Sequence, residues 1–414
     1  MILSLALAAC STTDLGGTGI GLSGFGSANL TPVGTPTTQG HDPGGTYAFV
    51  YGNQVWIKTA QDKTPRQLTH LALAAGTSYS WGPIVWSADG THLAFALGQS
   101  DQTATPATSG PLYIVDTSHG DAQLTAGTSS VFGHAYAWYG TSALFYANGA
   151  GIQFYDFSAP GDPRAFNAVV GSNGPDYSQS NSPHFVTFGD IAFLGQRLYA
   201  TRIDVAALGG TGAIGTAKVW SYFVPTAAGD YAGGSMGLSR FGLSGFPAVD
   251  LGKAYADGLG NVVAGGWNLA QDGGVAFDQV TGVDAKTGTV KSTVCYAFSY
   301  DFGGCDYTLF QDVSSFPVDA RPQLAFSTDG KTIAFGGPSV STEGRTGSAF
   351  AKLSPGAVGQ PPQWSPDDAS LAATQPPAAS SSSASQQSTT NIVIYAGGKS
   401  SVFVAGAEGL TWAP

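Results

Sequence analysis

Glutamate is almost absent from this chain, and charged residues of every kind are scarce. Only Glu343 and Glu408 are glutamates, and Asp, Glu, Lys and Arg together make up 10% of the 414 residues, against about 25% in an average soluble protein. Exposed helices draw heavily on Glu and Lys in regular spacing. The composition therefore argues against a mainly helical fold.

Positive charge is the rarer of the two signs. The chain has 16 Lys and Arg against 27 Asp and Glu, a net charge of -11, and no basic cluster. Nucleic acids and anionic lipid headgroups are bound through patches of Lys and Arg. We therefore expect no nucleic-acid partner.

Signatures of metal and catalytic chemistry are also missing. The six histidines stand far apart in the sequence and show no short metal-ligand spacing. A serine-hydrolase nucleophile elbow needs a strand, a turn and a helix in an α/β domain, and no such domain is indicated. We predict no metal, no cofactor and no catalytic residue, although carboxylates distant in sequence could still converge in the fold.

A short hairpin pattern recurs. It reads IVWSADGTHLAFAL at 84–97, LAFSTDGKTIAFG at 324–336 and QWSPDDASLAAT at 363–374. Each copy has a strand ending in an aromatic residue, a turn and a second apolar strand. Asp accepts local backbone hydrogen bonds and Gly supplies the positive φ of tight turns. The expected turn and core residues of this motif are Trp86, Asp89, Gly90, Phe326, Asp329, Gly330, Trp364 and Asp367.

The third copy has Asp368 where the others have Gly, so its turn is harder to predict. Residues 46–69 and 111–125 add two further strands each, the second ending in Leu-Thr. The repeating unit is then four antiparallel strands in 40 to 50 residues, the sequence pattern of a propeller blade.

This pattern of aromatic residue, turn, Ala-Phe strand and Leu-Thr strand resembles the blade repeat of TolB-type, WD-like β-propellers. Relatives of prolyl oligopeptidase share it in their non-catalytic propeller. The resemblance is clear at 46–125 and at the hairpins near 324 and 363, and diffuse between them. It implies an all-β fold, a β-propeller of four-stranded antiparallel blades.

The number of blades follows from the aromatic positions equivalent to Trp86. They indicate seven blades, although their irregular spacing leaves six or eight open. The equivalent positions are Trp138, Phe193, Trp267, Phe326, Trp364 and Trp412.

The C-terminal segment looks like half of the hairpin motif. Trp412-Ala-Pro supplies a first strand and a turn, and the missing second strand matches Gly45-Thr-Tyr-Ala-Phe near the other end of the chain. We therefore expect the last strand to pair into the first blade and close the ring. The folded domain would then extend from 46 to 414.

The N-terminal residues indicate export. The apolar run ILSLALAA at 2–9 leads into Cys10, and Leu7 to Cys10 resembles the lipobox of bacterial lipoproteins. The resemblance implies a signal peptide at 1–9, a lipidated Cys10 and an extracytoplasmic, lipid-anchored protein. The apolar run is short, and no Lys or Arg precedes it, so the basic region of a secretion signal is missing. The alternative is a buried strand with an incidental Cys. Residues 10–45 are rich in Gly, Ser and Thr and are expected to form a flexible tether.

The two remaining cysteines, Cys295 and Cys305, flank the sequence YAFSYDFGG. A turn at 301–304 would bring the flanking segments together, and an oxidising compartment favours a disulfide. Two reduced core cysteines are the alternative.

Two functions fit these observations. The first is a monomeric binding or scaffold module for an envelope protein, peptide or glycan, in contact with the membrane only through its lipid anchor. The second is a propeller-type hydrolase or lyase with acidic groups at the mouth of the channel. The fold does not decide between them.

Overall fold

The protein is all-β, as predicted. In the computed structural model, the regular elements run from β1 (Tyr47–Tyr51) to β33 (Ala407–Trp412), and the described residues include no α-helix. The structure describes residues 34–71, 78–100, 109–124, 130–131, 135–141, 143–148, 151–156, 164–171, 185–206, 212–224, 245–256, 262–284, 286–298, 304–311, 315–318, 323–337, 339–355, 361–375 and 390–414.

Most strands belong to antiparallel sheets of four or five neighbours. The first has the order β3 (Arg66–Gln67), β2 (Gln54–Lys58), β1, β33. The second has the order β4 (Ser78–Trp81), β6 (His92–Ser100), β8 (Leu112–Asp116), β9 (Gly120–Leu124), with β5 (Val85–Trp86) also paired to β6. The third is β11 (Tyr136–Tyr139), β12 (Ala143–Asn148), β13 (Gly151–Asp156), β14 (Arg164–Gly171). A separate pair is β7 (Ser109–Gly110) with β10 (Ser130–Val131).

The next sheet is a ten-stranded assembly of two groups. The first group is β15 (Phe185–Leu194), β16 (Arg197–Val205), β17 (Ala213–Phe223), β18 (Gly245–Ala256) and β19 (Val262–Val263). The second is β20 (Trp267–Leu269), β21 (Val275–Asp284), β22 (Thr289–Ala297), β23 (Tyr307–Leu309) and β24 (Ser315–Pro317).

One parallel pair, Gly252 with Val280, joins these two groups. Gly252 has φ +75°, and a Cβ there would lie 2.2 Å from the Val280 carbonyl oxygen. Only glycine allows this close approach.

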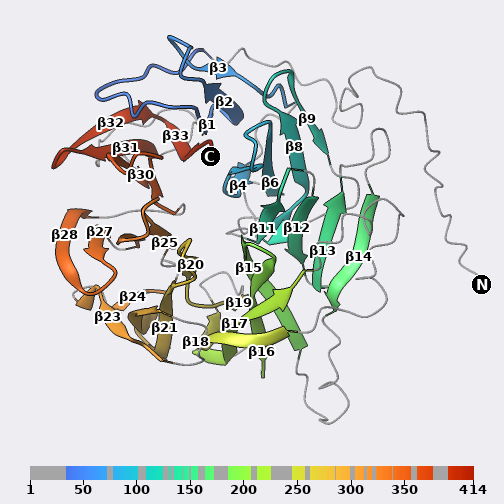
Figure 1. The fold of residues 1–414 in the computed structure, drawn as a ribbon, viewed down its shortest axis with the longest axis vertical. Helices are drawn as coiled ribbons and strands as arrows, with labels where there is room; N and C mark the ends of the chain where they lie inside the picture. The colour runs from blue at the N-terminus through green and yellow to red at the C-terminus, as the bar shows by residue number, and fades with distance from the viewer. Residues whose placement is uncertain are drawn as a thin grey trace, which may run out of the picture.

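Two more four-stranded sheets complete the described fold. One is β25 (Gln323–Phe326), β26 (Thr332–Gly336), β27 (Ser339–Gly344), β28 (Ser348–Pro355), and the other is β29 (Gln363–Trp364), β30 (Ser370–Gln375), β31 (Asn391–Ala396), β32 (Lys399–Ala405). The sheets follow one another around a common centre (Figure 1). This is the arrangement of a β-propeller.

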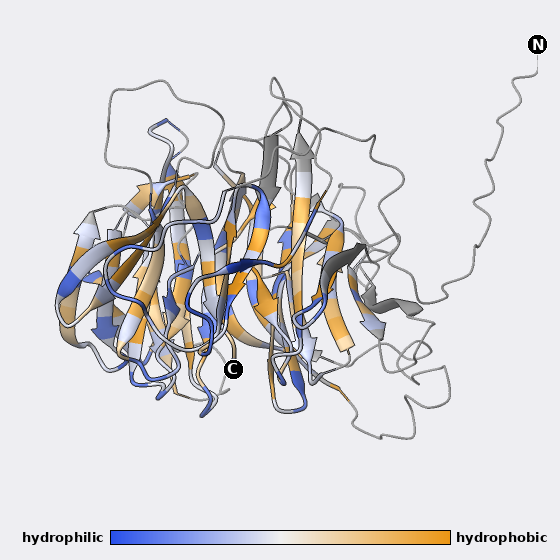
Figure 2. Cartoon of the chain, turned by 90° about the horizontal axis from the view of Figure 1, so that it is seen from above, coloured by the Kyte–Doolittle hydropathy of each residue, from blue (hydrophilic) through white to orange (hydrophobic). Residues whose placement is uncertain are grey.

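The core lies between neighbouring sheets. Phe145 and Phe154 of one sheet pack with Phe188 and Leu198 of the next, and other apolar clusters fill the remaining interfaces in the same way. A sheet covered on both faces needs apolar residues at most positions, so a strand such as β2 is buried throughout. Figure 2 shows the hydrophobic stretches within the strands.

The first and last strands that the structure describes are neighbours in one sheet. β33 pairs antiparallel with β1, with Trp412 opposite Tyr47 and Thr411 opposite Ala48. The Ala413 amide donates to the Thr46 carbonyl at 2.9 Å. Tyr47 is fully buried and Trp412 is 7% exposed. Residues before β1 also contact this region, since Gln39 donates its amide to the Phe403 carbonyl.

One carboxylate is buried without a hydrogen-bond partner among the described residues. Asp278 of β21 is 0% exposed, and neither of its oxygens is bonded. Burial raises its pKa from 3.8 to about 7; the neighbouring Ser292 hydroxyl acts weakly in the opposite direction and makes no well-formed hydrogen bond to it. Near neutral pH the folded protein must therefore either keep the Asp278 carboxyl group protonated or bury its negative charge. Either state lowers the free energy of unfolding.

This carboxylate predicts a pH-dependent stability. The folded pKa of Asp278 lies above its unfolded value, so stability falls as pH rises from about 4 to 7 and then levels off. Asp278→Asn should raise the free energy of unfolding at pH 8, by up to about 4 kcal/mol, and change it little at pH 4. Urea denaturation at both pH values measures this difference.

Asp329→Asn is the control whose effect on stability has the opposite sign. The Lys331 hydrogen bond lowers the pKa of Asp329 to about 2, so the charged form of this carboxylate stabilises the fold. That variant should lose stability at neutral pH. Equal stability of wild type and Asp278→Asn at pH 8 would contradict the claim that burial raises the pKa of Asp278.

Candidate functional site

Exposed aromatic side chains occur beside β22, on β23 and on β28. Among the described residues, three of the five exposed large hydrophobic side chains are Phe298, Tyr307 and Phe350, with exposures of 46%, 36% and 39%. Phe298 follows β22, Tyr307 begins β23 and Phe350 lies on β28. We call these three residues the aromatic surface.

Ring contacts connect the aromatic surface to the core. The Phe298 ring lies edge-on to Tyr307 at 5.5 Å and to Tyr296 at 4.9 Å. Phe350 contacts Phe310, whose centroid lies 6.3 Å away. Tyr296 and Phe310 are both buried. Phe298 and Phe350 are therefore each packed against a buried ring, which restricts their movement.

A disulfide holds the two sides of this region together, as the sequence predicted. Cys295 of β22 is bonded to Cys305, and their Cα atoms are 5.2 Å apart. The Asp306 carboxylate also accepts a hydrogen bond from the Phe298 amide at 2.8 Å. These links fix the backbone on both sides of the Phe298 and Tyr307 rings.

A guanidinium group from the neighbouring sheet covers part of the site. Arg345, in the turn between β27 and β28, lies 5.6 Å from the Tyr296 centroid and 5.7 Å from that of Phe298. It also donates a hydrogen bond to the Asp272 carboxylate in the turn before β21. That bond lowers the pKa of Asp272 and raises that of Arg345. Both groups are therefore charged across the physiological pH range.

The arrangement suits recognition of a partner surface. Aromatic residues and Arg are enriched where binding energy concentrates in protein interfaces. An aromatic ring with a polar neighbour can also cover apolar faces of peptides and sugars. Phe298 and Tyr307 lie beside segments that the disulfide joins, so these two rings lose little conformational freedom on binding.

The predicted repeat residues lie where neighbouring sheets meet. The seven aromatic positions fall on edge strands of their sheets: β5, β11, β15, β20, β25, β29 and β33. Trp138 donates its indole N–H to the Val85 carbonyl, and Trp364 donates to the Ala325 carbonyl, both at 3.2 Å. These bonds connect one sheet to the preceding one.

The predicted turns have the geometry that their residue types favour. Gly90 and Gly330 both have φ +69°. The carboxylates of Asp89, Asp329 and Asp367 accept hydrogen bonds from Ser87, Ser327 and Ser365 at 2.6 to 2.8 Å. These residues shape the hairpins, and none of them belongs to the aromatic surface.

The turn with Asp368 in place of Gly forms as well. Asp368 adopts φ +56°, a conformation that Asp tolerates better than most residues. Its carboxylate accepts hydrogen bonds from the Thr328 and Asp329 amides at 2.6 and 3.0 Å. The departure from Gly therefore adds a link between the turns of adjacent sheets.

Several predicted features lie outside the described residues. These are Cys10, the signal sequence at 1–9 and the tether up to residue 33. The sequence also holds one Gly-x-Ser-x-Gly pentapeptide, at 233–237, which matches the spacing of a hydrolase elbow. It too falls outside the described ranges.

The residues of the aromatic surface were not predicted from the sequence. One local signal was available, because the segment between the two cysteines begins YAFSYDF. Four of those seven residues are aromatic and they lead into a predicted turn, and turns usually lie at the surface. No local signal indicates Arg345 or Phe350, which come from another sheet.

Solved structures of other proteins are similar to this chain at low sequence identity. TolB from Acinetobacter baumannii is 13% identical, with 90% of this chain and 68% of that chain covered and a TM-score of 0.41. A quinonprotein alcohol dehydrogenase-like protein from Bacteroides thetaiotaomicron is 11% identical, with 90% and 79% covered and a TM-score of 0.45. Prolyl oligopeptidase B from Galerina marginata is 10% identical, with 92% and 52% covered and a TM-score of 0.46.

These TM-scores are all below 0.5, so no site or activity is inferred for this chain from these structures. No family model and no curated protein matches it. In the part of the chain that the structure describes, no three His, Cys, Asp or Glu side chains are grouped to hold a metal ion. No described helix is long and apolar enough to cross a membrane.

Reduction of the disulfide should destabilise the fold measurably. Replacing both Cys295 and Cys305 by Ala should lower the free energy of unfolding by about 2 to 3 kcal/mol, because the closed loop restricts the unfolded chain. Urea denaturation with and without dithiothreitol measures the effect. The double variant should not respond to the reductant. A wild-type protein that is equally stable in dithiothreitol would contradict the stabilising role.

Proposed function

We propose that this chain is a lipid-anchored, extracytoplasmic β-propeller that binds a protein, peptide or glycan of the cell envelope through its aromatic surface. The observation that carries the proposal is the exposure of Phe298, Tyr307 and Phe350, of which Phe298 contacts both the Tyr307 ring and the Arg345 guanidinium. A soluble surface that exposes grouped aromatic rings usually serves an interaction.

The propeller has seven blades in this proposal. Seven edge strands each carry one of the repeat aromatics, and each begins one group of antiparallel neighbours. The two groups of the ten-stranded sheet, on either side of the Gly252 to Val280 pair, count as separate blades. The pairing of β33 with β1 supports closure of the ring between the last and first blades.

Attachment to the membrane is assigned to Cys10. The support is the lipobox resemblance at Leu7 to Cys10 and a disulfide, which fits an oxidising compartment.

Metabolic labelling tests the anchor. In a bacterial host, the wild-type chain should incorporate an alkyne-tagged palmitate and sediment with membranes. Cys10→Ser should lose both properties, because the cysteine thiol is the atom group to which the palmitate-containing lipid is attached. The Cys295→Ala, Cys305→Ala variant is the matched control and should retain the label. Label on the Cys10→Ser chain would refute lipidation at this residue.

Capture from detergent-solubilised envelopes tests the binding surface. The full chain serves as bait, either as wild type or as the Phe298→Ala, Tyr307→Ala variant. A partner bound by wild type should be depleted at least about tenfold by the variant, because truncating a central aromatic residue typically costs 2 kcal/mol or more.

Val402→Ala is the matched control for this experiment. Val402 is also an exposed hydrophobic residue, at 38%, but it lies on β32. The control should capture the partner as well as wild type does. A partner retained equally by the aromatic variant and the control would place binding elsewhere on the protein.

A further inference from the structure

A segment before the first strand lies along the outer edge of the last sheet. Residues 36–44, which we call the strap, precede β1 and run beside β32 (Figure 1). Thr38 forms a β-bridge with Val404, and the Gln39 amide donates to the Phe403 carbonyl at 2.8 Å. β32 is the outermost strand of its sheet. The strap therefore covers part of an edge whose backbone groups would otherwise lack a strand partner.

The strap fits this edge closely. Pro36 and Pro43, near its two ends, are buried, whereas residues 37–42 between them are exposed. Gly40 has φ +66°, and a Cβ there would lie 2.9 Å from the Ser401 Cβ atom. Glycine adopts this backbone conformation without strain and allows so close an approach. The chain is therefore docked on the last sheet from residue 36 onward.

The other end of the strap is fixed to the first sheet. The Asp42 carboxylate forms an ion pair with Lys58 of β2 at 3.1 Å, and the Lys58 side chain is 9% exposed. The Asp42 carboxylate also accepts the Gly44 amide at 3.0 Å. The Gly44 carbonyl in turn accepts the Trp412 indole N–H at 3.2 Å. The strap thus connects β32 of the last sheet to β2 and β33 of the first sheet.

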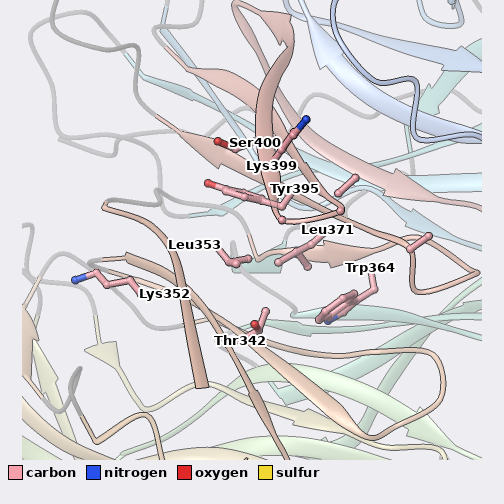
Figure 3. A pocket seen from close by; sticks show the side chains of 12 residues that line it. Thr342, Lys352, Leu353, Trp364, Leu371, Tyr395, Lys399 and Ser400 are labelled. Atoms are coloured by element: carbon pink, nitrogen blue, oxygen red, sulfur yellow. The ribbon is translucent and has the colours of Figure 1, made fainter. Parts of the chain in front are cut away.

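The strap covers the part of β32 that leads into β33. Its contacts reach from Val404 to Ser401, whereas Lys399 and Ser400 line a pocket of about 280 Å³ between this sheet and the β25–β28 sheet. Figure 3 shows the Lys352 and Lys399 side chains pointing away from the pocket and from each other. We therefore infer no charged ligand in the pocket.

We propose that the strap locks the closed ring, so that it must leave β32 before β1 can separate from β33. The strap leads into β1, and a single residue, Gly406, separates β32 from β33. The strap on β32 and β1 on β33 therefore hold the same two parts of the chain together.

The strap acts as a lock because it keeps the loop between the two pairings short. While the strap is docked, a β1 strand that separates from β33 remains close to it and pairs again at a small cost in loop-closure entropy. Tension on the chain before residue 36 likewise reaches β32 before it reaches β1. The proposal depends neither on the aromatic surface nor on lipidation of Cys10.

Amide hydrogen exchange of the full chain, measured by mass spectrometry, tests this lock. Gln39→Pro removes the amide that bonds to Phe403 and should speed exchange in β1 and β33 about fivefold, the equivalent of one backbone hydrogen bond. Exchange in β12 and β13, which belong to another sheet, should change by less than about twofold. Asp42→Asn should also speed exchange in β1 and β33, because it removes the negative charge that pairs with Lys58.

Thr37→Pro is the matched control. Thr37 is exposed, and its amide makes no backbone hydrogen bond to another residue that the structure describes, so exchange should stay at the wild-type rate. A second variant tests the lock in the opposite direction. In the oxidised Thr38→Cys, Val404→Cys variant, a disulfide between the bridged residues should slow exchange in β1 and β33, because the strap cannot leave. Circular dichroism of each variant checks that the fold is intact.

Two results with Gln39→Pro would overturn the proposal. One is unchanged exchange in β1 and β33. The other is equal acceleration in β1, β33, β12 and β13, because it would show a loss of global stability and no specific effect on the closure. If Gln39→Pro does not fold, the cross-linked variant decides: exchange in β1 and β33 at the wild-type rate would show that release of the strap does not limit opening.

Discussion

The antiparallel pairing of β1 with β33 is the interaction on which the rest of the structure depends. It joins strands that lie more than 350 residues apart, as the Trp412 bond to the Gly44 carbonyl shows with a separation of 368. Such a distant contact carries a large loop-closure cost, which local hydrogen bonds alone do not offset. Burial of Tyr47, Phe49 and Trp412 in one cluster with Phe403 supplies the apolar contribution.

Hydrogen bonds between neighbouring sheets fix the position of other sheets in the same way that the β1–β33 pairing fixes the first. The Trp138 and Trp364 indoles bond to the preceding sheet, and Asp368 bonds to the turn beside it. Each sheet is therefore positioned by its neighbours, and a site formed between two sheets inherits their geometry. The aromatic surface shows this, because Arg345 reaches from the β25–β28 sheet across to Phe298 and Tyr296.

The sequence predicted those features that are encoded locally. The Asp89 and Asp329 turns, the edge position of the repeat aromatics and the disulfide all follow from short stretches whose chemistry allows few conformations. The strand partner of Trp412 was also predictable, because Gly45-Thr-Tyr-Ala-Phe repeats a local pattern at the other end of the chain.

What the sequence did not indicate depends on contacts between distant segments. The pairing of Gly252 with Val280 requires two sheets to approach, and no local pattern marks that glycine among 59. The sequence alone indicated that Asp368 is a poorer turn residue than Gly. Its carboxylate accepts hydrogen bonds from the Thr328 and Asp329 amides of the neighbouring turn, which no local pattern predicts. The aromatic surface likewise combines residues from separate sheets, so it cannot be recognised before the sheets are assembled.

A designed cross-link tests the central pairing most directly. Ala48 and Thr411 lie opposite each other in the register of β1 and β33, at a spacing that suits a disulfide between antiparallel neighbours. In the Ala48→Cys, Thr411→Cys variant, thiol alkylation followed by mass spectrometry should find these two cysteines oxidised to each other. Alkylation is carried out in urea, because Ala48 and Thr342 are buried in the folded protein, and the control pair Ala48→Cys, Thr342→Cys should then be fully alkylated. Full alkylation of the first variant under the same oxidising conditions would contradict the pairing of the two strands.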